Sequence, residues 1–207
     1  LASGDYLCYT LTNNSSGTVT INGNPFNHNN TNVVTFTAGG NAETIINGSI
    51  LASTTAAHVF TKSGTGTLIY AGTAGTYSGA TNISAGTLSF SDVGGFANTS
   101  GILIGNATTT SGALTYTGPA ATLSKPITIN TTTANAFLNA SGTGALTVSG
   151  AITNSVAGAK TLTLGGSSTG DNTITSVFTN SGTSALSLMK IGAGTWVLAG
   201  TASNTLT

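Results

Sequence analysis

The chain has 207 residues, of which 39% are hydrophobic and 4% charged, and its four lysines balance its four acids so that the formal net charge is zero. Ordinary globular domains carry about 25% charged residues. Without arginine or clustered lysines the chain offers no electrostatic footprint for nucleic acid or anionic lipid. Disorder is also excluded, because disordered chains combine low hydrophobicity with high net charge. We therefore expect a folded protein with no nucleic-acid partner.

Short apolar–polar–apolar triplets recur along the chain and predict brief strands, because alternate side chains of a strand point to opposite faces. The outer residues of each triplet are expected to point inward and the central hydroxyl outward. The triplets with Ser or Thr at the centre are 19–21, 34–36, 88–90, 114–116, 127–129, 146–148, 162–164 and 186–188. Triplets 68–70, 102–104 and 196–198 are apolar throughout and are expected to be covered on both faces.

Clusters of Gly, Asn and Ser separate the triplets and predict corners, since these residues tolerate positive φ. No segment carries the apolar period of an α-helix over three turns, so the chain is expected to be all-β. Sandwiches and meander barrels use longer strands and more regular hairpins than this pattern contains. Very short strands between glycine corners favour a β-solenoid. At about 20 residues per coil, the chain would form about 9–10 coils.

A longer motif occupies residues 61–90 and returns in part over residues 190–207. Lys62-Ser-Gly-Thr-Gly-Thr-Leu in the first copy corresponds to Lys190-Ile-Gly-Ala-Gly-Thr-Trp in the second. The motif positions are Lys62, Gly64, Gly66, Thr67, Leu68, Tyr77, Gly79, Ile83, Gly86 and Leu88, then Lys190, Gly192, Gly194, Trp196 and Leu198. This spacing resembles the autotransporter-associated β-strand repeat of bacterial passenger domains.

The resemblance implies a right-handed parallel β-helix that is secreted and displayed on the bacterial cell surface, and it implies no enzymatic activity. We expect one elongated β-solenoid domain over residues 1–207. The second motif stops at Thr207, midway through the pattern. The chain is therefore expected to be either a piece of a longer passenger or a subunit whose neighbour completes the last coil.

No catalytic or metal-binding constellation emerges from the titratable residues. Glycoside hydrolysis needs two carboxylates about 5–10 Å apart, and no motif selects a pair from the acids at 5, 43, 92 and 171. His28 and His58 have no partner at metal-ligand spacing. The glycine loops at 64–67 and 192–195 resemble phosphate loops only superficially, because no helix follows them. We expect no enzyme, no cofactor and no metal site.

Two functions remain as hypotheses. The first is an extracellular structural protein whose subunits stack head to tail into a surface filament or matrix fibre, so that its partner is the chain itself. Few charges and open solenoid ends favour this association. The alternative is a fragment of an autotransporter adhesin whose polar face binds carbohydrate or a host surface, with extracellular polysaccharide as the partner. No apolar run reaches the roughly 18 residues of a membrane span.

Overall fold

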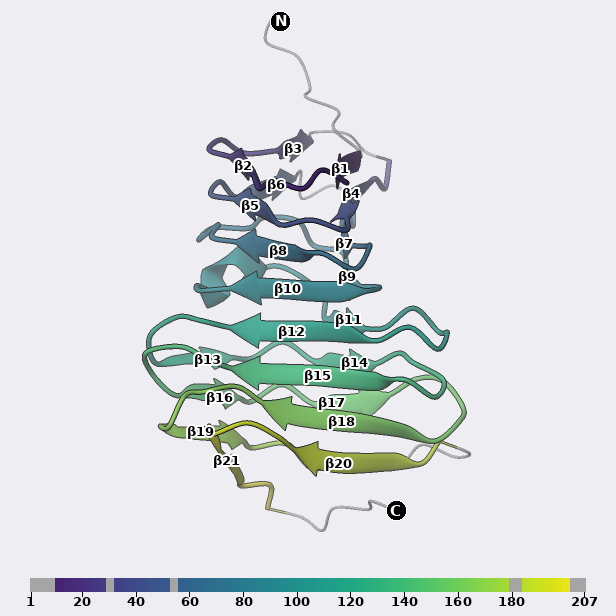
Figure 1. Ribbon diagram of the computed structural model, residues 1–207, viewed down its shortest axis with the longest axis vertical. Helices are drawn as coiled ribbons and strands as arrows, with labels where there is room; N and C mark the ends of the chain where they lie inside the picture. The colour runs from purple at the N-terminus through teal and green to yellow at the C-terminus, as the bar shows by residue number, and fades with distance from the viewer. Residues whose placement is uncertain (1–9, 29–31, 53–55, 179–183, 202–207) are drawn as a thin grey trace, which may run out of the picture.

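The computed structural model describes residues 10–28, 32–52, 56–178 and 184–201, which form a right-handed parallel β-solenoid (Figure 1). Each coil places its strands beside those of the coils before and after it. Leu88, for example, pairs with Leu68 of the preceding coil and with Leu114 of the following coil. The expected fold class is confirmed, and it follows from strands too short to pair with anything except the adjacent coil.

The number of coils is lower than expected. The longest sheet has eight strands, so the described residues make about seven turns rather than nine or ten. The register of the ladder shows the length of each coil, because paired residues lie one full coil apart. Leu68 pairs with Leu88 in the shortest coil, whereas Thr10 pairs with Thr37 in a longer one. Because most coils add a loop to their short strands, they are longer than the sequence led us to assume.

The solenoid has three faces, and the strands follow them in chain order. Face 1 contains β1 (Thr10–Asn13), β4 (Thr35–Gly40), β7 (Val59–Lys62), β9 (Thr81–Ile83), β11 (Ile102–Ile104), β14 (Ile127–Ile129) and β17 (Ile152–Asn154). Face 2 contains β2 (Val19–Ile21), β5 (Thr44–Ile46), β8 (Thr67–Tyr70), β10 (Gly86–Phe90), β12 (Gly112–Tyr116), β15 (Asn135–Ala140), β18 (Lys160–Gly165) and β20 (Leu186–Lys190). The face 2 strands are the arrows that point left in Figure 1.

Face 3 is interrupted. It begins with β3 (Phe26–His28) and β6 (Ile50–Ala52) and resumes with β13 (Ala121–Leu123), β16 (Leu146–Val148), β19 (Asp171–Ile174) and β21 (Thr195–Leu198). Between these two sheets the chain runs without a strand over 71–80 and then forms the short 3-10 helix η1 (Val93–Phe96). The rod widens below η1 (Figure 1). The interruption coincides with the first copy of the motif.

The inward residues of the triplets form one continuous core, as the alternation predicts. Burial of each large apolar side chain contributes about 1.5–3 kcal/mol to the stability of the rod. Aromatic rings line the amino-terminal half of this core in sequence of contact: Phe26, Phe36, Phe60, Tyr70, Phe96, Phe90 and Tyr116, with centroids 4.9–5.9 Å apart. Beyond Tyr116 the core is mainly Leu, Ile, Val and Ala.

The three all-apolar triplets are not covered on both faces. Their central residues point outward, where Ile69 and Leu103 are half-buried and Val197 is 38% exposed. Ile69 lies beside Ile45 of the adjacent coil, and Leu103 lies between Asn82 and Thr128. Neighbours on the same face therefore cover Ile69 and Leu103 in part, and the expected cover on both faces is not observed.

Candidate functional site

The first motif builds a corner that leads from face 1 to face 2, and Lys62 is its centre. Lys62 ends β7, and its side chain is only 2% exposed. Its Nζ donates hydrogen bonds to the main-chain oxygens of Ser63 at 2.6 Å, Gly64 at 2.8 Å and Ala85 at 3.2 Å. The first two acceptors belong to its own turn and the third to the next coil. The hydrogen bonds of Lys62 therefore connect two successive coils.

The glycines of the corner stack on one another. Gly64 has φ +68° and Gly86 has φ +67°, in the left-handed region that favours glycine. A Cβ atom on Gly86 would lie 2.5 Å from the carbonyl oxygen of Gly64 and 2.9 Å from Nζ of Lys62. Gly66 is equally confined, with the carbonyl oxygen of Ala42 at 2.2 Å from the position of a Cβ. Both the backbone angle and the close approach of adjacent coils require glycine here.

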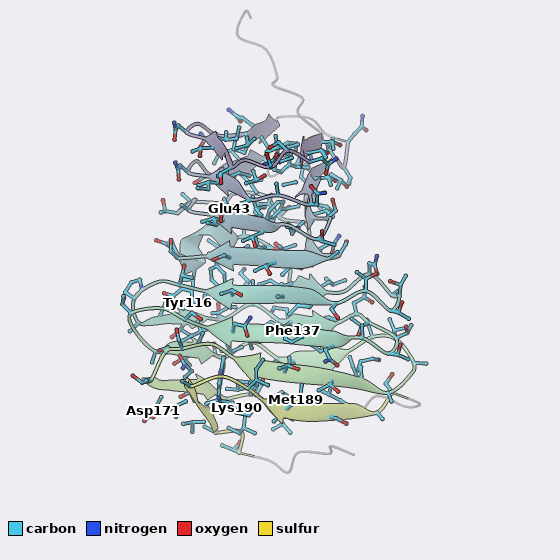
Figure 2. All side chains as sticks on the ribbon, viewed as in Figure 1. Glu43, Tyr116, Phe137, Asp171, Met189 and Lys190 are labelled. Carbon is cyan, nitrogen blue, oxygen red and sulfur yellow. The ribbon has the colours of Figure 1, made fainter. Side chains whose placement is uncertain are left out.

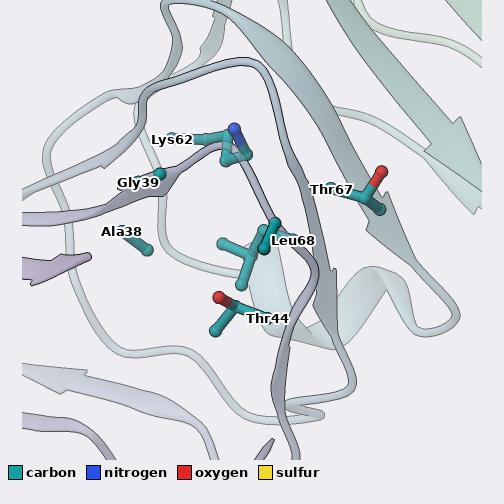
Figure 3. A pocket seen from close by; sticks show the side chains of 8 residues that line it. Ala38, Gly39, Thr44, Lys62, Thr67 and Leu68 are labelled. Carbon is teal, nitrogen blue, oxygen red and sulfur yellow. The ribbon is translucent and has the colours of Figure 1, made fainter. Parts of the chain in front are cut away.

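The space beside Lys62 is closed. Figure 3 shows Lys62 above Leu68 and Thr44 inside the corner, with Ala38 at the side. These residues enclose a gap too small for a water molecule, and Oγ1 of Thr44 is buried without a hydrogen-bond partner. Lys62 pairs in the ladder with Ala38 and Ile83, both of which belong to the core. The lysine thus occupies a position that is apolar in the neighbouring coils, and the corner has no room for a ligand.

The second part of the first motif replaces a strand of face 3 with side-chain hydrogen bonds. The hydroxyl of Tyr77 lies 2.7 Å from that of Thr81, which lies 3.1 Å from that of Thr99. Thr99 in turn donates to the carbonyl oxygen of Gly79 at 2.7 Å. All four residues are buried or tightly packed, and burial raises the pKa of the Tyr77 hydroxyl well above its ordinary value. The remaining motif residues, Ile83 and Leu88, are core residues at 0% exposure, and Thr67 begins β8.

The second motif builds the same corner at a different edge of the rod. Lys190 ends β20, and its Nζ donates to the carbonyl oxygens of Ile191 at 2.7 Å and Gly192 at 2.8 Å. Gly192 has φ +69°, like Gly64 in the first copy. This corner leads from face 2 to face 3, whereas the corner of Lys62 leads from face 1 to face 2. The motif therefore specifies a corner and not a particular face.

The second copy ends in less buried residues. Trp196 takes the place of Leu68, is half-buried, and donates from Nε1 to the carbonyl oxygen of Gly165 at 2.9 Å. Gly194 is buried, whereas Leu198 is 41% exposed. Residues 202–207 of this copy lie outside the described residues. The structure brings each copy together locally, but it does not bring the two copies into one site.

Lys160 forms a comparable cap that sequence reasoning missed. It is 2% exposed and its Nζ donates to the carbonyl oxygen of Val156, and burial lowers the pKa of its ammonium group. Lys62 and Lys190 each donate to a glycine two residues later in the chain, whereas the acceptor of Lys160 lies four residues earlier. The sequence around Lys160 therefore lacks the Lys-x-Gly pattern. The buried hydrogen-bond network of Thr81 and Thr99 was also not predicted, since threonines in a threonine-rich chain carry no signal of such a network.

Glu43, Asp92 and His58 each have a separate structural partner. Glu43 accepts a hydrogen bond from Oγ1 of Thr18 at 3.1 Å, and Asp92 accepts one from the N–H of Gly94 at 2.7 Å. The buried ring of His58 accepts from the N–H of Val34 at Nδ1. Asp5 and the side chain of His28 lie outside the described residues. Within the described ranges, no group of three or more His, Cys, Asp or Glu residues is placed to hold a metal ion.

Comparison with known proteins identifies the motif. The family model described as passenger-associated-transport-repeat matches residues 60–90 and 188–207. Over 145 residues the chain is 34% identical to the protein named adhesin BmaC autotransporter from Brucella suis biovar 1 (strain 1330). The match covers 66% of this chain and 4% of that relative. No solved structure matches the chain.

The chain is an autotransporter passenger repeat protein. Both matched segments contain the lysine-capped corners described above, so the repeat corresponds to a defined piece of structure. Passenger proteins of this kind are secreted to the bacterial cell surface, as the sequence led us to expect. The described residues of this passenger repeat protein contain no helix with the length and hydropathy of a membrane span.

The stacked glycines give a first prediction for the passenger repeat. Gly86→Ala should lower the free energy of unfolding by about 2–4 kcal/mol, because it combines a positive φ with contacts to Gly64 and Lys62. Gly17→Ala is the control: nothing lies within 4 Å of its added Cβ, and the change should stay within about 0.5 kcal/mol. Urea unfolding followed by circular dichroism measures both. Equal stability of the two variants would contradict the role assigned to the corner.

The buried ammonium group gives a second prediction. Burial lowers the pKa of Lys62 to about 8, below the ordinary value of 10.5 that applies in the unfolded chain. Between these values the unfolded chain holds a proton that the folded chain has released, so the free energy of unfolding should rise with pH. The window between about pH 8 and 9.5 avoids tyrosine ionisation. We expect unfolding curves to show this rise, and Lys62→Met to reduce it, with Lys160 contributing the remainder. A slope unchanged in Lys62→Met would show that Lys62 keeps its proton.

Proposed function

We propose that the chain is a non-catalytic, rod-like segment of a bacterial surface adhesin, and that the polar outer side of face 1 binds a host surface or its glycans. The passenger repeat and the similarity to a protein named as an adhesin support this proposal. The chain spans about 4% of the length of that relative. The observation that carries the proposal is a row of uncharged hydrogen-bonding side chains along face 1.

The row follows the register of the ladder from coil to coil. It consists of the outward-facing residues Thr37, Thr61, Asn82, Thr128 and Thr153, and the apolar Leu103 interrupts it between Asn82 and Thr128. Adjacent coils of a parallel ladder are about 4.8 Å apart, so the positions of the row recur at nearly constant spacing, with hydroxyls in two stretches, Thr37 to Thr61 and Thr128 to Thr153. Thr128 and Thr153 lie close enough for their Oγ1 atoms to hydrogen-bond at 3.3 Å. Such a row can donate to and accept from the hydroxyl groups of an extended polysaccharide.

Aromatic stacking contributes little to this proposal. Exposed Tyr or Trp beside Asn and Thr would have favoured sugar binding by ring stacking. Tyr70, Tyr77 and Tyr116 are buried, and Trp196 is half-buried and hydrogen-bonded. Tyr6 and Tyr9 lie outside the described residues. The described faces therefore favour recognition by hydrogen bonds.

Adhesion of the purified chain, coated on beads, to host cells or to an array of glycans tests this function. Thr128→Val/Thr153→Val removes two hydroxyls from face 1 while it keeps the branched shape that strands favour. The loss of two hydrogen bonds should weaken adhesion by about tenfold. Thr147→Val/Thr173→Val makes the same change in paired threonines of face 3 and should leave adhesion unchanged. Absence of adhesion by the wild-type chain, or equal loss in both variants, would contradict the proposal.

Head-to-tail stacking of the chain is a second candidate function, and the last described coil supports it. Exposed large hydrophobic residues gather there: Met189, Ile191, Val197 and Leu198 are 38–42% exposed. Met189 and Lys190 mark this end of the rod in Figure 2. Leu198 pairs with Ile174, which is fully buried, so Leu198 continues a core column that another coil would cover. Another coil, of a longer passenger or of a second copy, would provide this cover, since open strand edges and apolar surface both favour addition.

Sedimentation velocity over a range of concentrations tests this stacking. The wild-type chain should form larger species as its concentration rises, and Leu198→Lys should return it to monomer because a charge then faces the contact. Thr153→Lys places the same charge on the side of the rod, where it should leave assembly intact. A wild-type chain that remains monomeric at high concentration would exclude stacking.

A further inference from the structure

A cavity of about 300 Å³ lies on face 3, where η1 meets β13 and the rod widens (Figure 1). Val93 and Ala97 line it from the side of η1, and Thr122, Ser124 and Lys125 line it from the side of β13. Ligand pockets range from about 300 to 1,000 Å³, so this cavity suits a single small ring. None of these residues belongs to the repeat corners or to the row on face 1.

The floor of the cavity is the edge of a sheet. β13 is the first strand of its sheet and pairs only with β16. Ala121 and Leu123 form hydrogen bonds with the chain around β16. The N–H of Ala121 donates to the carbonyl oxygen of Ala145, and the carbonyl oxygen of Leu123 accepts from the N–H of Ser149. The N–H and C=O of the intervening Thr122 therefore point the other way, toward η1. No main-chain hydrogen bond joins η1 to β13 within the described ranges, so these groups face the cavity.

Lys125 supplies the charge. The chain has four lysines and no arginine. Lys62, Lys160 and Lys190 each donate from Nζ to main-chain carbonyl oxygens, whereas Lys125 forms no such bond in the structure described. Asp92, the acid just before η1, already accepts a hydrogen bond from Gly94. The one lysine not used as a cap thus lies beside two hydroxyls in the same cavity.

We propose that this cavity binds one carboxylated sugar residue, a hexuronic acid or a sialic acid. The ammonium group of Lys125 pairs with the carboxylate, because a charge-assisted hydrogen bond is stronger than a neutral one. The hydroxyls of Thr122 and Ser124 and the main chain of Thr122 bind the sugar hydroxyls. Val93 and Ala97 contact the apolar face of the ring. This inference rests on the proposed adhesin function and names a ligand for a site distinct from the row on face 1.

Saturation-transfer NMR and calorimetry of the full 207-residue chain test the site with three free sugars: glucuronic acid, N-acetylneuraminic acid and glucose. An open cavity with one charge pair should bind an acidic sugar with a Kd on the order of 1 mM. Glucose should bind at least about tenfold more weakly, since it lacks the carboxylate. Binding of either acid supports the proposal, and the tighter one identifies the source of the sugar.

Three variants distinguish specific binding in this cavity from non-specific binding of sugars to the chain. Lys125→Gln should weaken acidic-sugar binding at least about fivefold, whereas Lys125→Arg, which keeps the charge, should retain it. Ala97→Phe should fill the cavity and abolish binding without a change of charge. Equal binding by Lys125→Gln, equal binding of glucose, or no signal from either acid would overturn the proposal. So would a strand-forming peptide that shifts the β13 amide resonances when the acidic sugars do not.

The outcome is independent of the adhesion test. If beads coated with the chain adhere to cells and Lys125→Gln adheres equally well, the adhesin function stands and the sugar site fails. If the free sugars bind and the beads do not adhere, the site stands and the adhesin function fails.

Discussion

The parallel ladder of main-chain hydrogen bonds between coils is the constraint on which the rest of this structure depends. Each strand satisfies its N–H and C=O groups with the coils on either side, about 4.8 Å away. Corners must therefore stack as closely as strands, and a Cβ on Gly40 would lie 2.1 Å from the carbonyl oxygen of Asn13. The high glycine content follows from this spacing: glycine permits both the left-handed turn and the contact between successive turns.

The same spacing explains a buried lysine in a chain that is only 4% charged. A left-handed corner turns carbonyl oxygens away from the ladder, and buried carbonyls without partners cost free energy. The ammonium group of Lys62 offers three donors and satisfies carbonyls of two coils. Burial opposes this arrangement and lowers its pKa to about 8. The hydrogen bonds to Ser63, Gly64 and Ala85 offset that cost, and Lys190 repeats the device at another edge.

Local pattern predicted about half of the strands, those with an apolar–polar–apolar or all-apolar triplet, and missed strands such as β1 and β3 that lack one. The alternation that placed Leu88 and Phe90 inward is confirmed by their complete burial. The number of coils was wrong, because coil length depends on loops whose sizes no local pattern records. Loop lengths also decide that the corner of Lys62 leads from face 1 to face 2 whereas the corner of Lys190 leads from face 2 to face 3, so this difference was not predicted. The cavity beside Lys125 was not predictable, since it arises where two coils of different outline meet and its residues are scattered over 93–125.

A regular solenoid has repetitive side faces, so concave sites arise where the repeat is broken. Here a short coil separates Leu68 from its partner Leu88, and a longer coil separates Leu88 from its next partner Leu114. The longer coil contains η1, which covers the rod without pairing with β13. The first repeat motif lies directly before this change, and its Tyr77 network replaces a strand on the same face. The motif therefore has a second structural effect besides forming corners. It separates the β3–β6 sheet of face 3 from the sheet that begins with β13, so β13 has an unpaired edge.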